Sequence, residues 1–260
     1  MTIAGTAATY DFGGRVALVT GGGSGLGEAC VRRLAASDAG VLVVDLSLEQ
    51  AQRVGAEADA LGRGRVVAVQ ADVSDSSSMA GVAEVLKLEF GRLDCAVNSA
   101  GVGAEPMSVV DYDLGEWTRV LNVNLTGVLV AMQVELRAML DAGVPGSVVN
   151  LASVFAHRGR AGAAAYVASK HAVAGLTATA ALDVAEHGIR VNAVSPGFIE
   201  TPMVTARHDE AARSVIAGLH PLNRLGTPDE IADAVVWLLS DSARFVTGAA
   251  YAADAGFLAR

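Results

Sequence analysis

The chain has 260 residues, a formal net charge of −9, and apolar residues at 52% of its positions. This length suffices for one large α/β domain or two small ones, and it allows a substantial core without disulfides or metals. The acidic balance, with no cluster of Lys and Arg, excludes nucleic acid as an expected partner, because phosphate contacts need clustered positive charge.

The start of the chain does not resemble a secretory signal, and the apolar runs do not resemble membrane-spanning segments. Residues 1–14 lack a positively charged region and a long apolar run, so no secretory signal is expected. Later apolar runs are broken by Gly, Asn, Ser or charged residues before they reach the length of a bilayer span. We expect a cytoplasmic protein without a membrane partner, with Cys30 and Cys95 as buried free thiols.

Short apolar runs alternate with helix-like segments along the whole chain, and such runs between helices are typical of parallel strands buried on both faces. The expected strands are Arg15–Thr20, Gly40–Asp45, Arg65–Gln70, Leu93–Asn98, Ser147–Leu151 and Ile189–Val194. The expected helices include Gly25–Ala36, Leu48–Leu61, Asp113–Asp141 and Ala163–Glu186. The alternation predicts an α/β fold with a doubly wound parallel sheet of about seven strands and helices on both faces.

No linker, charge block or low-complexity tail divides the chain, so residues 1–260 are expected to form a single domain. The one irregular region runs from Pro196 to about Thr227 and has weak periodicity. In a sheet of this kind such a segment lies beyond the strand ends, where ligands bind, and we interpret it as a substrate lid. An ordinary surface connection is the alternative.

A glycine-rich segment follows the first expected strand directly and opens a helix. Glycines there let the backbone approach a pyrophosphate, and the helix N-terminus offers unpaired N–H groups and a partial positive charge. This position after the first strand indicates a dinucleotide-binding site. The residues that we assign to it are Gly21, Gly23, Ser24, Gly25, Leu26 and Gly27.

Asp45 closes the second expected strand, at the distance where a ribose-binding acid is expected. Its carboxylate accepts hydrogen bonds from the adenosine ribose and repels a 2′-phosphate, and neither Ser24 nor Leu46 is basic. The sequence therefore favours NAD over NADP, although a helix N-terminal acid is another role for Asp45. Asp72 and Val73, after the third strand, are assigned to the adenine, with a loop cap as an equal alternative for Asp72.

Tyr166 and Lys170 stand four residues apart in an alanine-rich helical segment, so both side chains lie on one face. A free tyrosine has a pKa of about 10 and is a poor base at neutral pH. A nearby ammonium favours the phenolate, so we expect Lys170 to lower the pKa of Tyr166. The pair would act as a general acid/base for an alcohol proton. A Tyr and a Lys at this spacing often occur by chance. The glycine-rich segment upstream is what favours a functional role for the pair.

Taken in order, these motifs make the chain resemble a short-chain dehydrogenase/reductase of the compact, single-domain, NAD-preferring type, from about Gly14 to the C-terminus. The resemblance implies a Rossmann fold. It is carried by Thr20–Gly27, Asn98-Ser99-Ala100-Gly101, Asn124, Ser153, Tyr166 with Lys170, and Pro196-Gly197. Two positions depart from the family pattern: Ser99 replaces a common second Asn, and Ala255 replaces a usual Gly.

The resemblance also implies roles for the matching residues. Ser153 would hold the substrate oxygen, unless it only caps a turn, and Lys170 would bond the nicotinamide ribose. Asn124, with Asn122 as a competing candidate, would position a water in a proton relay. Tyr166 would be the catalytic acid/base. Further cofactor contacts would come from Asn98, Ala100, Gly101, Pro196, Gly197, Ile199 and Thr201.

The residues expected near the substrate are mainly apolar, which indicates an uncharged cyclic or aromatic alcohol or ketone. They are Ser153, Val154, Phe155, His157, Ala163, Phe198, Met203, Val204 and His208. His157 would bond a second substrate oxygen or be a solvated loop histidine. Arg207 would bind a carboxylate or remain solvated.

The sequence thus predicts an NAD-dependent enzyme that interconverts a secondary alcohol and a ketone. One alternative is a 3-oxoacyl-(acyl-carrier-protein) reductase, which as a rule needs NADPH and a basic patch. The other is a non-catalytic NAD-binding sensor or scaffold. The expected partners are a small-molecule substrate and further copies of the chain, since relatives form dimers and tetramers through two of their helices. No metal site is expected, because the histidines are scattered.

Overall fold

Seven parallel strands form one sheet in the order β3-β2-β1-β4-β5-β6-β7 in the computed structural model, which describes residues 9–260. The strands are β1 (Val16–Thr20), β2 (Gly40–Asp45), β3 (Val66–Gln70), β4 (Cys95–Asn98), β5 (Ser147–Leu151), β6 (Arg190–Pro196) and β7 (Ala250–Ala253). The doubly wound parallel sheet is confirmed, and the six strands located from the sequence lie where they were expected, with small shifts at their ends.

The seventh strand was counted but not located from the sequence. β7 pairs only with β6 and forms the edge of the sheet. Its four residues, from Ala250 to Ala253, are partly or fully exposed, so they lack the apolar run that marks the buried strands. An edge strand with one solvated face therefore gives a weak signal.

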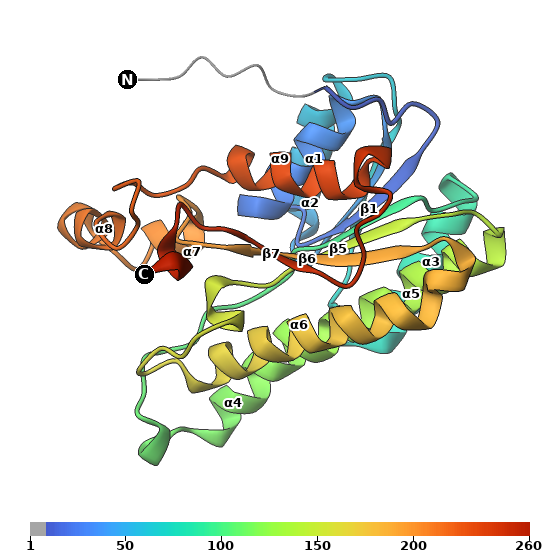
Figure 1. The fold of residues 1–260 in the computed structure, drawn as a ribbon. Coiled ribbons are helices and arrows are strands. Elements are labelled where there is room, and N and C mark those ends of the chain that lie inside the picture. Colours follow the sequence, from blue (N-terminus) through green and yellow to red (C-terminus); the bar gives the residue numbers. More distant parts are fainter. Residues whose placement is uncertain (1–8) are drawn as a thin grey trace.

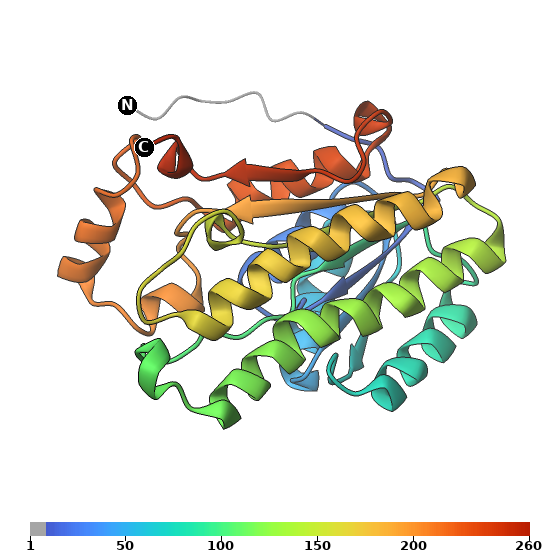
Figure 2. The same cartoon turned by 60° about the horizontal axis from the view of Figure 1, so that its bottom comes forward.

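Two layers of helices cover the sheet (Figure 1). One face carries α1 (Gly25–Ala35), α2 (Leu48–Asp59) and α9 (Pro228–Leu239), and the other carries α3 (Ser76–Glu89), α5 (Gly127–Ala142) and α6 (Ala164–Val184). Figure 2 shows α6, α5 and α3 side by side. Val19 of β1 packs into the first apolar core and its neighbour Leu18 into the second, which is why the strands are apolar on both faces.

One long helical run, Leu114–Ala142, consists of α4 (Leu114–Leu121), a π-helical turn (Asn122–Thr126) and α5. By length and composition it is the one helix of residues 9–260 that could cross a membrane. The sequence analysis expected no apolar run of that length. Its buried residues, such as Val128 and Met132, belong to the core between the helices and the sheet. Core helices of this kind pass the same test, so the run carries little weight for a membrane.

The segment that was expected to be irregular contains two short helices, α7 (Pro202–Thr205) and α8 (Glu210–Ala217). Asp209 caps α8, since its carboxylate accepts a hydrogen bond of 2.8 Å from the Ala212 N–H. Both helices lie beyond the end of β6, at the side where the strand arrows point (Figure 1). This place fits a lid, and the lid role remains a prediction.

Both cysteines, Cys30 and Cys95, are free and buried, as expected. Burial raises the pKa of each thiol to about 12. The two thiols therefore remain protonated at neutral pH and behave as small apolar side chains of the core.

A buried polar network joins the middle of the sheet to α5 and α6. Asn98 of β4 and Asn150 of β5 are register neighbours, and the Asn98 Nδ2 donates to the Asn150 Oδ1 at 2.9 Å. The same Nδ2 donates to the Glu135 Oε2 at 3.0 Å, and the Asn150 Nδ2 donates to the Thr177 Oγ1 at 2.9 Å. Within the described chain the Glu135 Oε1 has no partner. Burial raises the pKa of Glu135 to about 8.

Glu135→Gln is expected to stabilise the protein at alkaline pH and leave it nearly unchanged at acid pH. The ordinary carboxyl pKa is 4.5 and the folded value is about 8, so the unfolded chain releases this proton first as pH rises. The unmodified protein therefore loses stability as the pH rises from the lower to the higher of these two values. Below the lower value, Glu135 has no effect on the pH dependence of its stability. Thermal unfolding at about pH 4 and pH 9 should show a higher Tm only at pH 9, by several °C.

Glu84→Gln on α3 is the matched control, because Glu84 is exposed. Its Tm should follow that of the unmodified protein at both pH values. A Glu135→Gln variant that loses stability equally at both would show that the ionised carboxylate is accommodated in the fold.

Candidate active site

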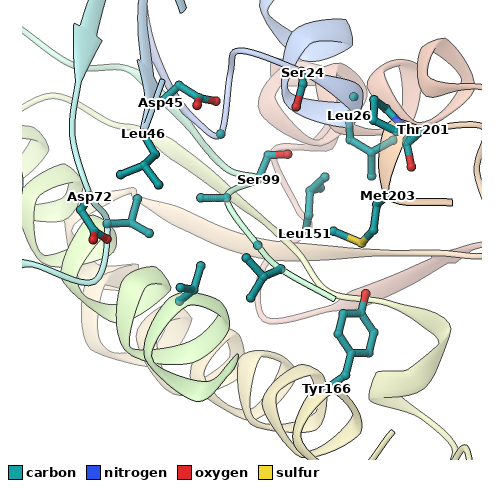
Figure 3. A pocket seen from close by; sticks show the side chains of 18 of the residues that line it. Ser24, Leu26, Asp45, Leu46, Asp72, Ser99, Leu151, Tyr166, Thr201 and Met203 are labelled. Carbon is teal, nitrogen blue, oxygen red and sulfur yellow. The ribbon is translucent and has the colours of Figure 1, made fainter. Parts of the chain in front are cut away.

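An elongated cavity of about 400 Å³ runs along the carboxyl ends of the strands, where the order of the sheet reverses between β1 and β4. Figure 3 shows Asp45, Leu46 and Asp72 toward one end of it and Tyr166 at the other. Thirteen of its lining residues were assigned to the cofactor from the sequence: Gly21, Ser24, Gly25, Leu26, Asp45, Leu46, Asp72, Val73, Ala100, Gly101, Tyr166, Lys170 and Thr201.

The glycine-rich segment forms the floor of this cavity. Gly21 has a φ of +63°, and a Cβ there would come within 2.7 Å of the Ala100 backbone, so only glycine fits. A Cβ on Gly27 would collide with the Gly21 carbonyl oxygen. Ser24 precedes α1 and makes no side-chain capping bond, which leaves the first N–H groups of this helix for a ligand. The segment fits the pyrophosphate of a dinucleotide.

The Asp45 carboxylate lies between the glycine-rich segment and the start of α2. Its Oδ2 accepts a hydrogen bond from the Gly23 N–H at 2.9 Å, and its Oδ1 accepts one from the Ser47 N–H at 3.0 Å. The cap of α2 is Ser47, whose side chain accepts a bond from the Gln50 N–H. Asp45 is thus not needed as the helix cap and presents a fixed negative charge to the cavity.

Asp72 caps a loop and also lines the cavity, so its adenine role remains a prediction. Its Oδ1 accepts hydrogen bonds from the Ser74 N–H and the Ser74 hydroxyl, at 2.8 and 2.7 Å, so it caps the loop before α3. It also lines the cavity (Figure 3). The loop bonds fix the carboxylate in place without removing it from the site.

Tyr166 and Lys170 lie one turn apart on α6, with the Lys170 Nζ 5.7 Å from the centre of the Tyr166 ring. The tyrosine hydroxyl points into the cavity (Figure 3). The Lys170 Nζ donates a 2.7 Å hydrogen bond to the Leu151 carbonyl oxygen at the end of β5. Ser153 follows β5, and its Oγ accepts a bond of 3.2 Å from the Phe155 N–H. Ser153 therefore caps a turn, and it shares the wall of the neighbouring cavity with Tyr166, whose pKa its hydroxyl lowers.

The expected lowering of the Tyr166 pKa by Lys170 is wrong for this structure. Burial raises the pKa of Tyr166, while the Ser153 hydroxyl and the charge of Arg160 lower it by smaller amounts. Burial also lowers the pKa of Lys170 to about 8. The ammonium is bonded to a carbonyl and is itself destabilised by desolvation, which the residue spacing could not show.

Asn124 is buried in the π-helical turn and fixes the loop after β4. Its Oδ1 accepts a hydrogen bond of 2.7 Å from the Val102 N–H, and its Nδ2 donates to the Val102 carbonyl oxygen at 2.9 Å. A Cβ built on Gly101 would lie 3.3 Å from the Asn124 Oδ1 and 3.9 Å from the Lys170 Nζ. Asn124 and Lys170 therefore flank the same glycine, while Asn122 begins the π-helical turn.

A second cavity, of about 480 Å³, opens beside the first and shares five lining residues with it, Tyr166 among them. The shared residues are Leu26, Ala152, Tyr166, Thr201 and Met203. Its walls include most residues expected near the substrate: Ser153, Phe155, Ala163, Phe198, Met203, Val204, Arg207 and His208. Pro196, Gly197 and Ile199, which were assigned to the cofactor, line this cavity.

Comparison with known proteins agrees with this geometry. The family model described as enoyl-(acyl carrier protein) reductase matches residues 21–258. Cyclohexanol dehydrogenase of Acinetobacter sp. is 42% identical over 249 residues, covering 96% of this chain and 97% of that protein. The chain belongs to the short-chain dehydrogenase/reductase family.

Two further members of the short-chain dehydrogenase/reductase family show the range of similarity. Cis-4-hydroxycyclohexanecarboxylate dehydrogenase of Sinomonas cyclohexanicum is 40% identical, covering 95% of this chain and 98% of that protein. The crystal structure of carveol dehydrogenase from Mycobacterium avium in complex with NAD superposes with a TM-score of 0.91. It is 28% identical and covers 95% of this chain and 99% of that one.

Several residues that the sequence assigned to the substrate or the cofactor do not line either cavity. His157 is exposed, its Nε2 lies 2.9 Å from the Ser195 Oγ, and it is absent from the wall of the second cavity. Val154 is fully buried in an aromatic cluster. The Asn98 amide belongs to the network with Glu135 and supports the sheet. Gly23 and Gly27 act through the backbone geometry of the glycine-rich segment.

Two charged residues of the second cavity, Glu105 and Arg160, were missed from the sequence. Arg160 stands six positions before Tyr166, on the loop that enters α6. This proximity to Tyr166, the residue expected to be the acid/base, was the available signal. Glu105 lies after β4 in a loop with no motif, so nothing in the sequence placed it there.

Proposed function

We propose that the chain is an NAD-dependent dehydrogenase that interconverts cyclic secondary alcohols and ketones. The observation that carries the proposal is the position of Tyr166, whose side chain lines both cavities at the place where they meet. A proton acceptor at this junction faces a substrate on one side and a cofactor on the other. The wall of the second cavity, with Phe155, Phe198 and Met203, fits an apolar ring.

The residues of this chain have distinct tasks in the reaction. Ser153 and Tyr166 bind the alcohol oxygen and orient its carbon toward the first cavity, and Tyr166 accepts the hydroxyl proton. Lys170, whose Nζ lies 5.7 Å from the centre of the Tyr166 ring, passes the proton on to a water held near Asn124. NAD, when bound, supplies the acceptor for the hydride of the same carbon. In the reductive direction Tyr166 returns the proton to the ketone oxygen.

The preference for NAD over NADP is part of the proposal. The Asp45 carboxylate lies at the cavity end away from Tyr166, and the next residue, Leu46, carries no positive charge (Figure 3). A carboxylate there accepts ribose hydroxyl bonds and repels a 2′-phosphate. The solved complex of carveol dehydrogenase with NAD supports this choice.

The activity is tested by following NADH formation with a panel of cyclic, aromatic and aliphatic secondary alcohols, each with NAD and with NADP. We expect turnover with cyclic alcohols and NAD. A preference for NADP and an acyl thioester would favour the acyl-carrier-protein reductase, and NAD binding without turnover in either direction would favour a non-catalytic sensor or scaffold. Both outcomes would contradict the proposal.

Two further expectations belong to the proposal. We infer that the protein acts in the cytoplasm as a homo-oligomer, a dimer or a tetramer. Exposed apolar side chains on the helical layer, such as Leu129 and Leu182, support association. Light scattering that gives a monomer mass at micromolar concentration would contradict it.

A further inference from the structure

The second cavity contains charged side chains whose charges do not cancel. Arg207 of the lid segment donates a hydrogen bond of 2.9 Å to the Ala104 carbonyl oxygen and one of 3.1 Å to the Glu105 Oε1. Glu105 and Arg207 thus form an ion pair at the cavity rim. The His208 Nδ1 lies 3.0 Å from the Val204 carbonyl oxygen. Arg160 is the remaining charged residue of the wall.

Arg160 is held over aromatic rings instead of a carboxylate. Its Cζ lies 5.3 Å from the centre of the Phe155 ring and 5.5 Å from that of Phe198. Among residues 9–260 its guanidinium forms no ion pair and no hydrogen bond, whereas Arg207 in the same wall forms both. A guanidinium over two ring faces keeps its planar array of donors free for a ligand.

The position of Arg160 relative to Tyr166 determines which part of a bound substrate Arg160 can contact. The Phe155 ring packs edge-on against the Tyr166 ring, with centroids 6.5 Å apart, and Arg160 lies over Phe155. Phe155 therefore packs against both the Arg160 guanidinium and the Tyr166 ring. Its charge still acts on Tyr166, whose pKa it lowers slightly. A substrate ring bound beside Phe155 would direct its far side toward Arg160.

We propose that Arg160 selects cyclic alcohols that carry a carboxylate on a ring carbon remote from the hydroxyl. The inference rests on the proposed function and deepens it, and it departs from the uncharged substrate expected from the sequence. A guanidinium binds a carboxylate through two parallel charge-assisted hydrogen bonds, which a neutral amide or a bare ring does not replace. Because the chain has a net charge of −9, an anionic substrate needs such a local cation.

The test compares 4-hydroxycyclohexanecarboxylate with its carboxamide and with cyclohexanol. In the unmodified protein we expect kcat/KM to be about 10- to 100-fold higher for the carboxylate than for the carboxamide, mainly through KM. Arg160→Gln should reduce this ratio to within about threefold of one, and any effect of the lost charge on Tyr166 should change kcat/KM alike for all three compounds and cancel in the ratio. Arg160 is exposed, so this variant should fold normally.

Two other arginines serve as controls. Arg158 is exposed and lies over the Phe257 ring, outside the cavity wall, so Arg158→Gln should keep the preference for the carboxylate. Arg207→Gln tests the paired arginine of the same cavity. If Arg207→Gln abolished the preference and Arg160→Gln preserved it, the assignment of Arg160 would be wrong. Equal use of carboxylate and carboxamide by the unmodified protein would also overturn it.

A binding measurement separates this inference from the proposed function. Calorimetry with cyclohexanecarboxylate and cyclohexanecarboxamide, in the presence of NAD, needs no turnover. Tighter binding of the carboxylate that is lost in Arg160→Gln supports the anion site even if no alcohol is oxidised. Equal binding of the two compounds rejects the site even if cyclohexanol is oxidised rapidly.

Discussion

Replacing Tyr166 by phenylalanine is expected to lower kcat by about 10²- to 10⁴-fold, while the affinity for NADH stays within about threefold. The substitution removes the hydroxyl that faces both cavities and retains the ring that packs against Phe155. Without the hydroxyl, Ser153 still binds the alcohol oxygen but no group accepts its proton. Stopped-flow or steady-state NADH formation gives kcat, and NADH fluorescence titration gives the affinity.

Tyr251→Phe is the matched control for this experiment. Tyr251 lies on the edge strand β7, with its ring packed edge-on against Trp237, and it lines neither cavity. Removing the Tyr251 hydroxyl should leave kcat unchanged. If Tyr166→Phe retained near-normal turnover, Tyr166 would not be the acid/base, and a different donor would have to be sought in the cavity wall.

The parts of the fold that the sequence predicted are those where local pattern and tertiary environment agree. β1, with Leu18 and Val19 buried on opposite faces, had to be an uninterrupted apolar run. Gly21 and Gly27 stand where a Cβ would collide with backbone, so steric exclusion fixes their identity. Residues that are fixed by burial or by steric exclusion keep the same identity whatever the substrate is, so the sequence pattern reveals them. The glycine-rich segment and the positions of the buried strands along the chain were therefore predictable.

The parts that were missed depend on contacts between residues far apart in the chain. His157, left open between a substrate contact and a solvated loop, bonds to Ser195 on β6. Glu135 is a charged residue in an apolar helix face, and its partner Asn98 lies 37 positions earlier. Arg160 and Arg207 look alike in the sequence, and only the ion pair with Glu105 distinguishes them. Contacts between side chains of different helices and strands produce no repeating pattern in the sequence, so pattern analysis cannot predict them.

The second large effect is expected for Asp45→Asn, which should shift the cofactor preference from NAD toward NADP. The amide oxygen keeps an acceptor for the Gly23 N–H, which now bonds the carboxylate at 2.9 Å, so the glycine-rich segment should keep its shape, while the bond from the Ser47 N–H is lost. Loss of the charge weakens the bonds to the ribose hydroxyls and removes the repulsion of a 2′-phosphate. Charge-assisted bonds contribute about 1.5–3 kcal/mol, and repulsion between close charges has a similar size near a protein surface.

We therefore expect the ratio of kcat/KM with NAD to that with NADP to fall by about 10²- to 10³-fold in Asp45→Asn. Calorimetric Kd values for the two cofactors should change in the same direction, which separates binding from turnover. Glu49→Gln is the control, because Glu49 carries the same charge in the first turn of α2 but is exposed and lies outside the cavity. If this control shifted the ratio as much as Asp45→Asn, the preference would come from the general field of the protein. If neither variant shifted it, the cavity would select NAD by other contacts, and the role given to Asp45 would be wrong.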